Sequence, residues 1–140
     1  MSKRCRYTNK EVALLGRLMR SEALGEGNFG MMLVGNVVIN RVVAKCSNFK
    51  KQKTIHAVIY AKNAFDGTKT PLFKSGATGK EKEMALKVIR YWRADPATRA
   101  LYYYYPGKKK KCKSRFWGKY VGKYKNHCFY TEDKLSKCGI

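Results

Sequence analysis

A glutamate at the end of an amphipathic helix is the residue of this chain best placed to do chemistry. Residues 9–24 are predicted to be helical, because Thr8 and Glu11 form a capping box and apolar side chains follow at helical spacing. Glu22 falls on the apolar stripe of this helix, and Gly25 ends it. Burial and the helix dipole would both favour the protonated form of a carboxyl group there, which suits a general acid. The alternative is a carboxylate that pairs with a buried arginine or turns outward.

The elements that position this glutamate are predicted to be mainly helical. The apolar run over residues 29–45 is typical of a buried central helix, with Asn28 as its N-cap. A short helix is expected after Thr54. Another is expected after a second capping box, Thr78 with Glu81, and this helix should end at Asp95–Pro96. Residues 61–77, between the two helices, are expected to be a long loop.

The C-terminal third has the composition of short strands. Strands are predicted at residues 101–105, 116–117 and 127–130, so we expect an α+β fold with a small β-rich C-terminal part. Its tyrosines could stack on nucleobases while its lysines neutralise phosphates. Alternatively, the tyrosines could stack on pyranose rings, or they could only pack a hairpin. Because strand residues alternate between faces, at most half of Tyr102–Tyr105 should line one site.

Composition indicates one folded and very basic domain. Hydrophobic residues make up 44% of the chain and aromatic residues 13%, while 31 Lys and Arg against 9 Asp and Glu give a net charge of +22. Such a surface attracts polyanions. We expect a single domain over residues 1–140, with its core at about 9–130 and a flexible tail at 131–140. We also expect synthesis in the cytoplasm without a signal peptide.

The cysteines predict neither disulfides nor a metal site. There are five, an odd number, and their spacing is irregular, which favours a reducing compartment: Cys5, Cys46, Cys112, Cys128 and Cys138. Three of them could bind zinc together with His127, but the spacing matches no common ligand pattern: Cys112, Cys128 and Cys138.

Two motifs together resemble the signature of the SleB/CwlJ cell wall hydrolases, the spore cortex-lytic enzymes. Residues 21–26 read SEALGE and residues 37–42 read VVINRV, where the family has roughly xEAxGE and VVLNRV. Downstream agreement follows in the family's order and extends the resemblance over about residues 9–130: Ile55, Val58–Tyr60, Ala64–Phe65, Ala100–Tyr103, His127 and Phe129. The chain departs from the family at Tyr104–Tyr105, in the loop 66–77, in the lysine run 108–111 and in its net charge.

The resemblance implies a lysozyme-like or lytic-transglycosylase-like domain that cleaves the MurNAc–GlcNAc β-1,4 bond of peptidoglycan. The glutamate at the position of Glu22 would be the catalytic acid and base. The expected substrate-binding residues are Glu26, Phe65, Tyr102, Tyr103, Trp117 and His127. No cofactor and no metal are implied. His127 could equally be a structural histidine.

The scarcity of carboxylates favours a lytic transglycosylase over an N-acetylmuramidase. Most glycosidases need two carboxylates, and only Glu26 and Asp66 are credible partners for Glu22. A structural role is preferred for Glu26, because its carboxylate could instead bind backbone amides of its loop. Arg41 is expected to be a structural tether, since a buried guanidinium close to Glu22 would hold that carboxyl in its ionised form.

Two classes of function remain in play at this point. As an enzyme, the protein would act as a monomer on glycan strands of the bacterial cell wall, drawn by its charge to anionic envelope polymers or lipopolysaccharide, and a bacteriophage endolysin would fit this description. As a binding module, it would hold nucleic acid through the Lys- and Tyr-rich C-terminal third. No RNP, KH or zinc-finger signature supports a specific nucleic-acid partner.

Overall fold

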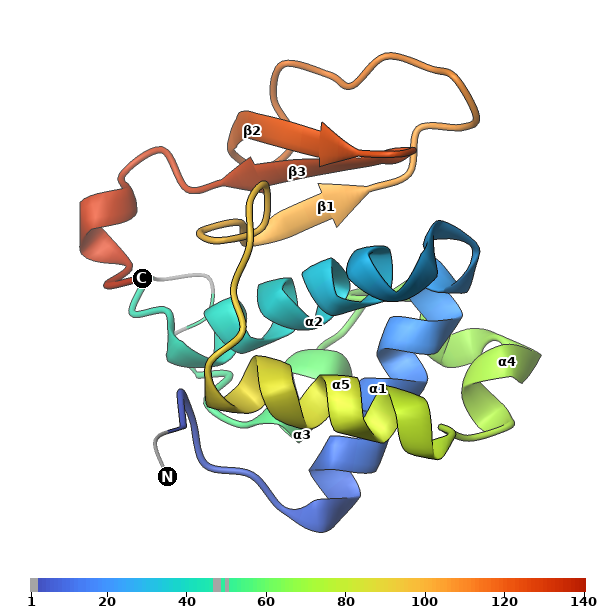
Figure 1. The fold of residues 1–140 in the computed structure, drawn as a ribbon. Coiled ribbons are helices and arrows are strands. Elements are labelled where there is room, and N and C mark those ends of the chain that lie inside the picture. The colour runs from blue at the N-terminus through green and yellow to red at the C-terminus, as the bar shows by residue number, and fades with distance from the viewer. Residues whose placement is uncertain (1–2, 47–48, 50) are drawn as a thin grey trace.

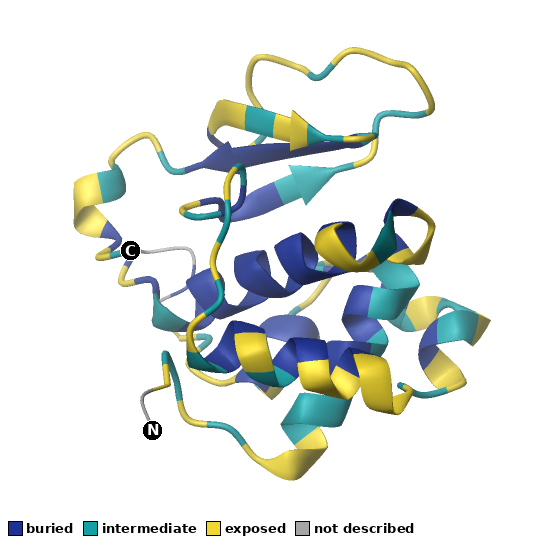
Figure 2. Cartoon of the chain, viewed as in Figure 1, coloured by how far each residue is buried: buried dark blue, intermediate teal, exposed yellow. Residues whose placement is uncertain are grey.

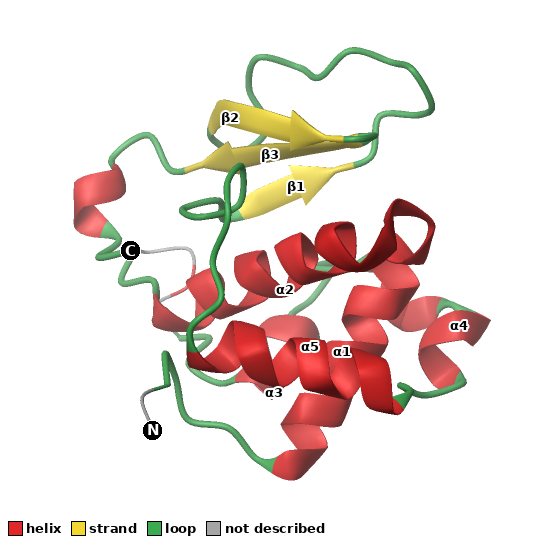
Figure 3. Ribbon diagram, in the orientation of Figure 1, coloured by secondary structure: helices red, strands yellow, loops and turns green. Residues whose placement is uncertain are grey.

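The structure, a computed structural model, describes residues 3–46, 49 and 51–140. A small antiparallel sheet lies over a group of helices, with α2 directly beneath it (Figures 1 and 3). The elements are α1 (Asn9–Ala23), α2 (Gly27–Val43), α3 (Ile55–Ile59), α4 (Pro71–Lys74), α5 (Gly79–Arg90), β1 (Tyr102–Tyr104), β2 (Lys119–Tyr124) and β3 (His127–Thr131). The predicted α+β class is confirmed. None of the helices in these ranges is long and apolar enough to cross a membrane.

Helix α1 begins where its capping box predicts. The Thr8 hydroxyl oxygen accepts a hydrogen bond from the Glu11 backbone N–H at 3.1 Å, and Glu11 Oε1 accepts one from the Thr8 N–H at 3.1 Å. After Ala23 the chain continues in a 3-10 turn, η1 (Leu24–Glu26). Glu22 therefore lies in the last turn of α1, as predicted.

Helix α2 forms the centre of the core. Every residue from Gly30 to Val42 is buried, as predicted for a central helix (Figure 2). The prediction of Asn28 as its N-cap is wrong, because α2 begins at Gly27 and Glu26 holds the N-cap position. Gly27 has a φ of 81°, a conformation that glycine adopts without strain, and this lets the chain pass from η1 straight into α2.

Two asparagines of α2 hold the segment that leads into the sheet. Asn36 Nδ2 donates a hydrogen bond to the Ala97 carbonyl at 2.9 Å, and Asn40 Nδ2 donates to the same carbonyl at 3.0 Å and to that of Ala100 at 2.8 Å. Both side chains are fully buried, where polar groups need partners. The segment before β1 is thereby fixed against α2.

Two helical predictions need correction. The predicted loop at residues 61–77 contains a 3-10 turn, η3 (Asp66–Lys69), and the short helix α4. Helix α5 starts after its predicted capping box but ends at Arg90 instead of at Asp95–Pro96. The chain leaves the helix earlier because the Ala94 N–H donates to Asn36 Oδ1 at 3.2 Å, which draws this stretch onto α2.

The sheet has the strand order β1–β3–β2, and both pairs are antiparallel. Tyr103 pairs with Phe129 between β1 and β3. The predicted strands at 101–105 and 127–130 are confirmed as β1 and β3, whereas the one at 116–117 is wrong. Trp117 has a φ of 62°, which is incompatible with extended backbone, and β2 begins only at Lys119.

Two disulfides overturn the expectation that the cysteines are unpaired. Cys46 is joined to Cys138, and Cys112 to Cys128, while Cys5 is free. An odd cysteine count does not prevent two pairs from forming, and irregular spacing says little about cysteines that the fold brings together from distant segments.

The segment 131–140, expected to be a flexible tail, is attached to the body of the protein. Thr131 is the last residue of β3, and its hydroxyl donates to the Arg99 carbonyl at 2.6 Å. Cys138 is fully buried, and its carbonyl accepts a hydrogen bond from the Lys45 N–H at 2.8 Å. The covalent bond to Cys46 holds the end of the chain beside the end of α2.

Replacing Cys46 and Cys138 together with serine should lower the free energy of unfolding more than replacing Cys112 and Cys128. The first bond spans 92 residues and the second 16. Loop-closure entropy of the unfolded chain grows with the logarithm of this span, which predicts a difference of about 1.5 kcal/mol. Urea unfolding of the two double variants measures it. An equal loss in both would contradict the loop-length explanation.

Candidate active site

Glu22 lies in the wall of a cavity of about 830 Å³. Its side chain is half-buried, and each carboxyl oxygen has a fixed hydrogen-bond donor. The Tyr103 hydroxyl donates to Oε1 at 2.5 Å, and the Gly67 backbone N–H donates to Oε2 at 2.7 Å. These two bonds orient the carboxyl group, while leaving further lone pairs on both oxygens for a proton or a ligand.

Gly67 reaches Glu22 because it has no side chain. A Cβ at this position would overlap with Glu22 Oε2 and would lie 2.6 Å from the Ser21 hydroxyl oxygen. The turn η3 that carries Gly67 is closed by the Thr70 hydroxyl, which donates to the Gly67 carbonyl at 2.7 Å. Sequence analysis missed this residue, since its role depends on contact with a helix 45 positions away.

Tyr103 is the hydroxyl donor to Glu22. Burial raises the pKa of Tyr103 well above its usual value, and the nearby Glu22 carboxylate raises this pKa further. Its ring is stacked against Phe65 at 6.1 Å between centroids and lies 5.6 Å from the ring of His127. The position of the ring in β1 is thus fixed from two sides.

Arg41 lines the same cavity without hydrogen bonding to Glu22 among the bonds of the described residues. It is buried, and its Nε donates to the Leu101 carbonyl at 2.6 Å, which is a tether as expected. The expectation that the guanidinium would stay away from Glu22 is not met, because the two charges lie close enough to interact. Its guanidinium lies 4.8 Å from the centroid of the Phe65 ring. Burial lowers the pKa of Arg41, and the nearby Tyr103, Tyr102 and Glu22 offset only part of this shift.

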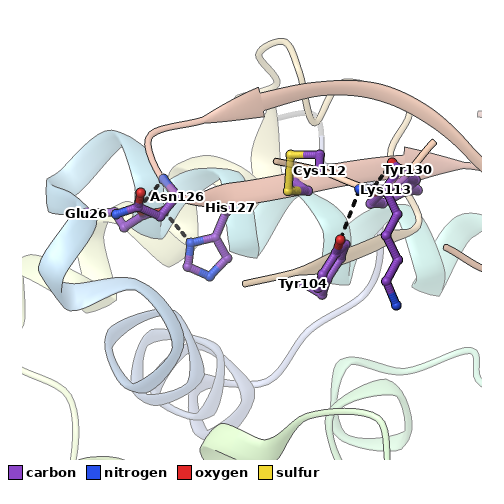
Figure 4. The surroundings of a disulfide bond; sticks show 8 residues. Glu26, Tyr104, Cys112, Lys113, Asn126, His127 and Tyr130 are labelled. Atoms are coloured by element: carbon purple, nitrogen blue, oxygen red, sulfur yellow. Dashed lines mark hydrogen bonds and ion pairs between the residues drawn. A yellow bond between two sulfur atoms is a disulfide. The ribbon is translucent and has the colours of Figure 1, made fainter. Parts of the chain in front are cut away.

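A second cavity, of about 290 Å³, adjoins the first. Glu22, Tyr105 and His127 line both, so the two cavities meet beside these residues. Glu26, in the wall of the smaller cavity, is fully engaged: one oxygen contacts His127 Nδ1, and the other accepts a hydrogen bond from the Asn126 N–H at 2.8 Å (Figure 4). This carboxylate fixes the β2–β3 turn and orients the imidazole.

The structure brings the predicted site residues together around these cavities. The larger one is lined by Glu22, Phe65, Tyr102, Tyr103, Trp117 and His127, and the smaller one by Glu22, Glu26 and His127. Trp117 is 75% exposed and stands at the rim. Asp66, the other candidate carboxylate, is exposed and also lines the larger cavity.

The tyrosine run contributes more residues to the cavity than alternation predicts. All of Tyr102–Tyr105 line the larger cavity. The reason is that β1 is an edge strand that ends at Tyr104, so the cavity extends around its open side and its end. Sequence analysis also missed Phe116, whose ring is stacked on that of Tyr104 at 4.7 Å and which lines the same cavity.

The described residues offer no cluster of three or more His, Cys, Asp or Glu side chains that could hold a metal ion. The three cysteines considered above as zinc ligands are in disulfides: Cys112 and Cys128 with each other, and Cys138 with Cys46.

Comparison with known proteins identifies a family and several relatives. Residues 25–130 match the family described as cell wall hydrolase. The cell wall hydrolase CwlJ of Oceanobacillus iheyensis is 39% identical over 128 residues, which cover 90% of this chain and 89% of the relative. CwlJ of Bacillus subtilis is 40% identical over 126 residues, which cover 89% and 87% of the two chains.

Two solved structures share the fold. The catalytic domain of Bacillus cereus SleB has a TM-score of 0.71 at 23% identity, covering 90% of this chain and 93% of that domain. The catalytic domain of the germination-specific lytic transglycosylase SleB from Bacillus anthracis has a TM-score of 0.70 at 22% identity, covering 89% and 97%. The expected lysozyme-like fold and the resemblance to the SleB/CwlJ enzymes are confirmed.

Replacing Gly67 with alanine should disable the site while the protein stays folded. The new Cβ pushes the Glu22 carboxyl from its place, and a displacement of about 1 Å costs roughly 100-fold in rate. The measurement is release of soluble fragments from purified cell walls. Gly79→Ala is the matched control, because a Cβ there meets nothing within 4 Å. Equal rates for both variants would show that this close approach does not position Glu22.

Replacing Tyr103 with phenylalanine should flatten the loss of stability at alkaline pH. The raised pKa of Tyr103 means that above pH 10 the unfolded chain releases this proton while the folded protein keeps it. The free energy of unfolding therefore falls as pH rises, by about 1.4 kcal/mol per pH unit from this one group. Urea unfolding between about pH 10 and 11.5 should show a shallower slope for the variant. Parallel slopes would contradict a Tyr103 that stays neutral in the folded protein.

Proposed function

This chain belongs to the cell wall hydrolase family, which acts on peptidoglycan, and on this premise we propose that it is a lytic transglycosylase with Glu22 as its single catalytic acid and base. The bond cleaved is the β-1,4 linkage between N-acetylmuramic acid and N-acetylglucosamine. The observation that carries the proposal is the Glu22 carboxyl, held by two donors at the junction of two cavities.

In the first step Glu22 gives its proton to the glycosidic oxygen, and the bond from that oxygen to C1 of the muramoyl sugar breaks. The carboxylate that remains is stabilised by the Tyr103 hydroxyl and the Gly67 N–H, which already point at its two oxygens. Neither donor has to move as negative charge develops on the carboxyl oxygens.

In the second step the same carboxylate takes the proton of the C6 hydroxyl on the muramoyl sugar, and the C6 oxygen bonds to C1. The product is a 1,6-anhydromuramoyl end, and Glu22 recovers its proton without using water. Tyr103 is excluded as the base, because burial raises its pKa well above the working range and its hydroxyl already donates to Glu22.

The two cavities supply binding sites on either side of the cleaved bond. Their junction at Glu22 suits a polymer that passes through the site, as an internal bond of a glycan strand requires. Phe65, Tyr102 and the exposed Trp117 offer aromatic faces to sugar rings. Glu26 acts as a positioning residue, because both of its oxygens are used to hold the β2–β3 turn and His127.

Asp66 supports a second candidate, an N-acetylmuramidase. It is an exposed carboxylate in the wall of the larger cavity, one residue before Gly67, and could hold a water molecule for hydrolysis. The setting that we propose for either reaction is lysis of a bacterial host, with the net charge of +22 drawing the protein to an anionic envelope.

Mass spectrometry of fragments released from sacculi tests the mechanism. The wild-type protein should release anhydromuramoyl ends, and Glu22→Gln should lower the rate by about 1,000-fold or more, since the proton donor is lost. Asp66→Asn should still produce anhydro ends. Glu83→Gln is a matched control on an exposed position of α5. Reducing ends that disappear in Asp66→Asn would favour the muramidase, and release by Glu22→Gln at the wild-type rate would refute both.

A further inference from the structure

The larger cavity forms the cleft in which a glycan strand is proposed to lie, and Trp117 belongs to its wall. The segment around Trp117 carries the densest positive charge of the chain. Residues 105–125 contain nine Lys and Arg and no Asp or Glu. All nine are exposed, on the long loop between β1 and β2 and on β2 and its turn (Figures 1 and 2). This basic ridge consists of Lys108, Lys109, Lys110, Lys111, Lys113, Arg115, Lys119, Lys123 and Lys125.

The protein itself neutralises little of this charge. Across the described residues, Arg115 is the one member of the ridge with a carboxylate within 4.0 Å, that of Asp133 at 2.5 Å. Lys125 Nζ donates to the backbone carbonyl of Glu26 at 3.2 Å, and Lys113 Nζ lies 5.6 Å from the ring centroid of Tyr104. The four lysines at 108–111 therefore repel one another with no acidic neighbour to offset the repulsion.

The loop is held in place despite that repulsion. The Cys112–Cys128 bond ties it to β3, one residue from His127 (Figure 4). The Tyr130 hydroxyl donates to the Lys113 carbonyl at 2.6 Å, and the Lys113 N–H donates to the Tyr104 hydroxyl oxygen at 3.0 Å. The covalent bond and the two hydrogen bonds fix the lysine run at its base and give it a defined position on the surface. A run without these bonds would be disordered in solvent.

The same segment lines the cleft through Tyr105, Phe116 and Trp117. A glycan strand in the cleft and an anion on the ridge can therefore belong to one polymer, and linked binding of this kind multiplies affinity without new contacts. The nine cationic side chains also outnumber the few carboxylates of one peptidoglycan stem peptide. Repeating charge at this density matches a polymer with one phosphodiester in each unit.

We propose that the basic ridge binds a poly(alditol phosphate) chain attached to the glycan strand that occupies the cleft. This inference rests on the proposed function for the position of the strand. The ridge thereby directs the protein to cell walls that carry such polymers, and the attraction weakens as salt is added.

The test uses the replacement of Lys108, Lys109, Lys110 and Lys111 with glutamine. The matched control replaces four exposed lysines of the helical side with glutamine: Lys74, Lys80, Lys82 and Lys87. The net charge of both variants therefore falls from +22 to +18 through the loss of four lysines. Binding is measured in a Glu22→Gln background on sacculi that retain poly(glycerol phosphate), and on the same sacculi stripped with hydrofluoric acid.

Stripping should weaken binding of the parent protein by about ten-fold or more, and the ridge variant should show that loss already on decorated sacculi. The control should bind decorated sacculi within about three-fold of the parent. With Glu22 intact, the ridge variant should digest stripped sacculi at the wild-type rate.

Equal losses in both lysine variants would overturn the proposal in favour of net charge alone. A ridge variant that loses binding to single-stranded DNA but not to decorated sacculi would overturn it in favour of nucleic acid. Unchanged binding by the parent after stripping would also refute it. Failure of the proposed function has a different signature, namely no fragment release from stripped sacculi by the wild-type protein.

Discussion

The two hydrogen bonds that hold the Glu22 carboxyl join three segments that are distant in sequence. Gly67 lies 45 residues and Tyr103 81 residues from Glu22, in η3 and in β1. A half-buried carboxylate without donors is costly, so each bond contributes both to the orientation of the carboxyl group and to the packing of the three segments around it. Displacing α1, η3 or β1 alone would leave a polar group without its partner. The position of the Glu22 carboxyl therefore depends on contacts between all three segments.

Helix α2 is what allows these segments to meet. It is buried all around, and its apolar side chains contact α1 on one side and the sheet on the other, through Leu33 and Val37 against Phe129. Its buried polar residues are directional: Asn36 and Asn40 bind carbonyls of the segment before β1, and Arg41 binds that of Leu101. The polar interruptions in an apolar sequence thus set where β1, and with it the Glu22 donor, must run.

Local signals in the sequence predicted local structure. The Thr8 capping box predicted the start of α1, and helical spacing placed Glu22 in the last turn. Contacts between distant segments left no such signal. Gly67 is one of twelve glycines, and only the approach of Glu22 distinguishes it. The pairing of Cys46 with Cys138 was missed for the same reason, because it depends on how the chain returns to the end of α2.

Glu22 and Glu26 are four residues apart, yet the structure gives them opposite circumstances. On one continuous helix they would share a face, but η1 intervenes and turns Glu26 toward the β2–β3 turn. There the Glu26 carboxylate is buried and both oxygens are committed, to the Asn126 N–H and to His127. Glu22 keeps an open side toward both cavities. A single turn of 3-10 helix therefore separates a carboxyl group that faces two cavities from one that is buried in the wall beside them.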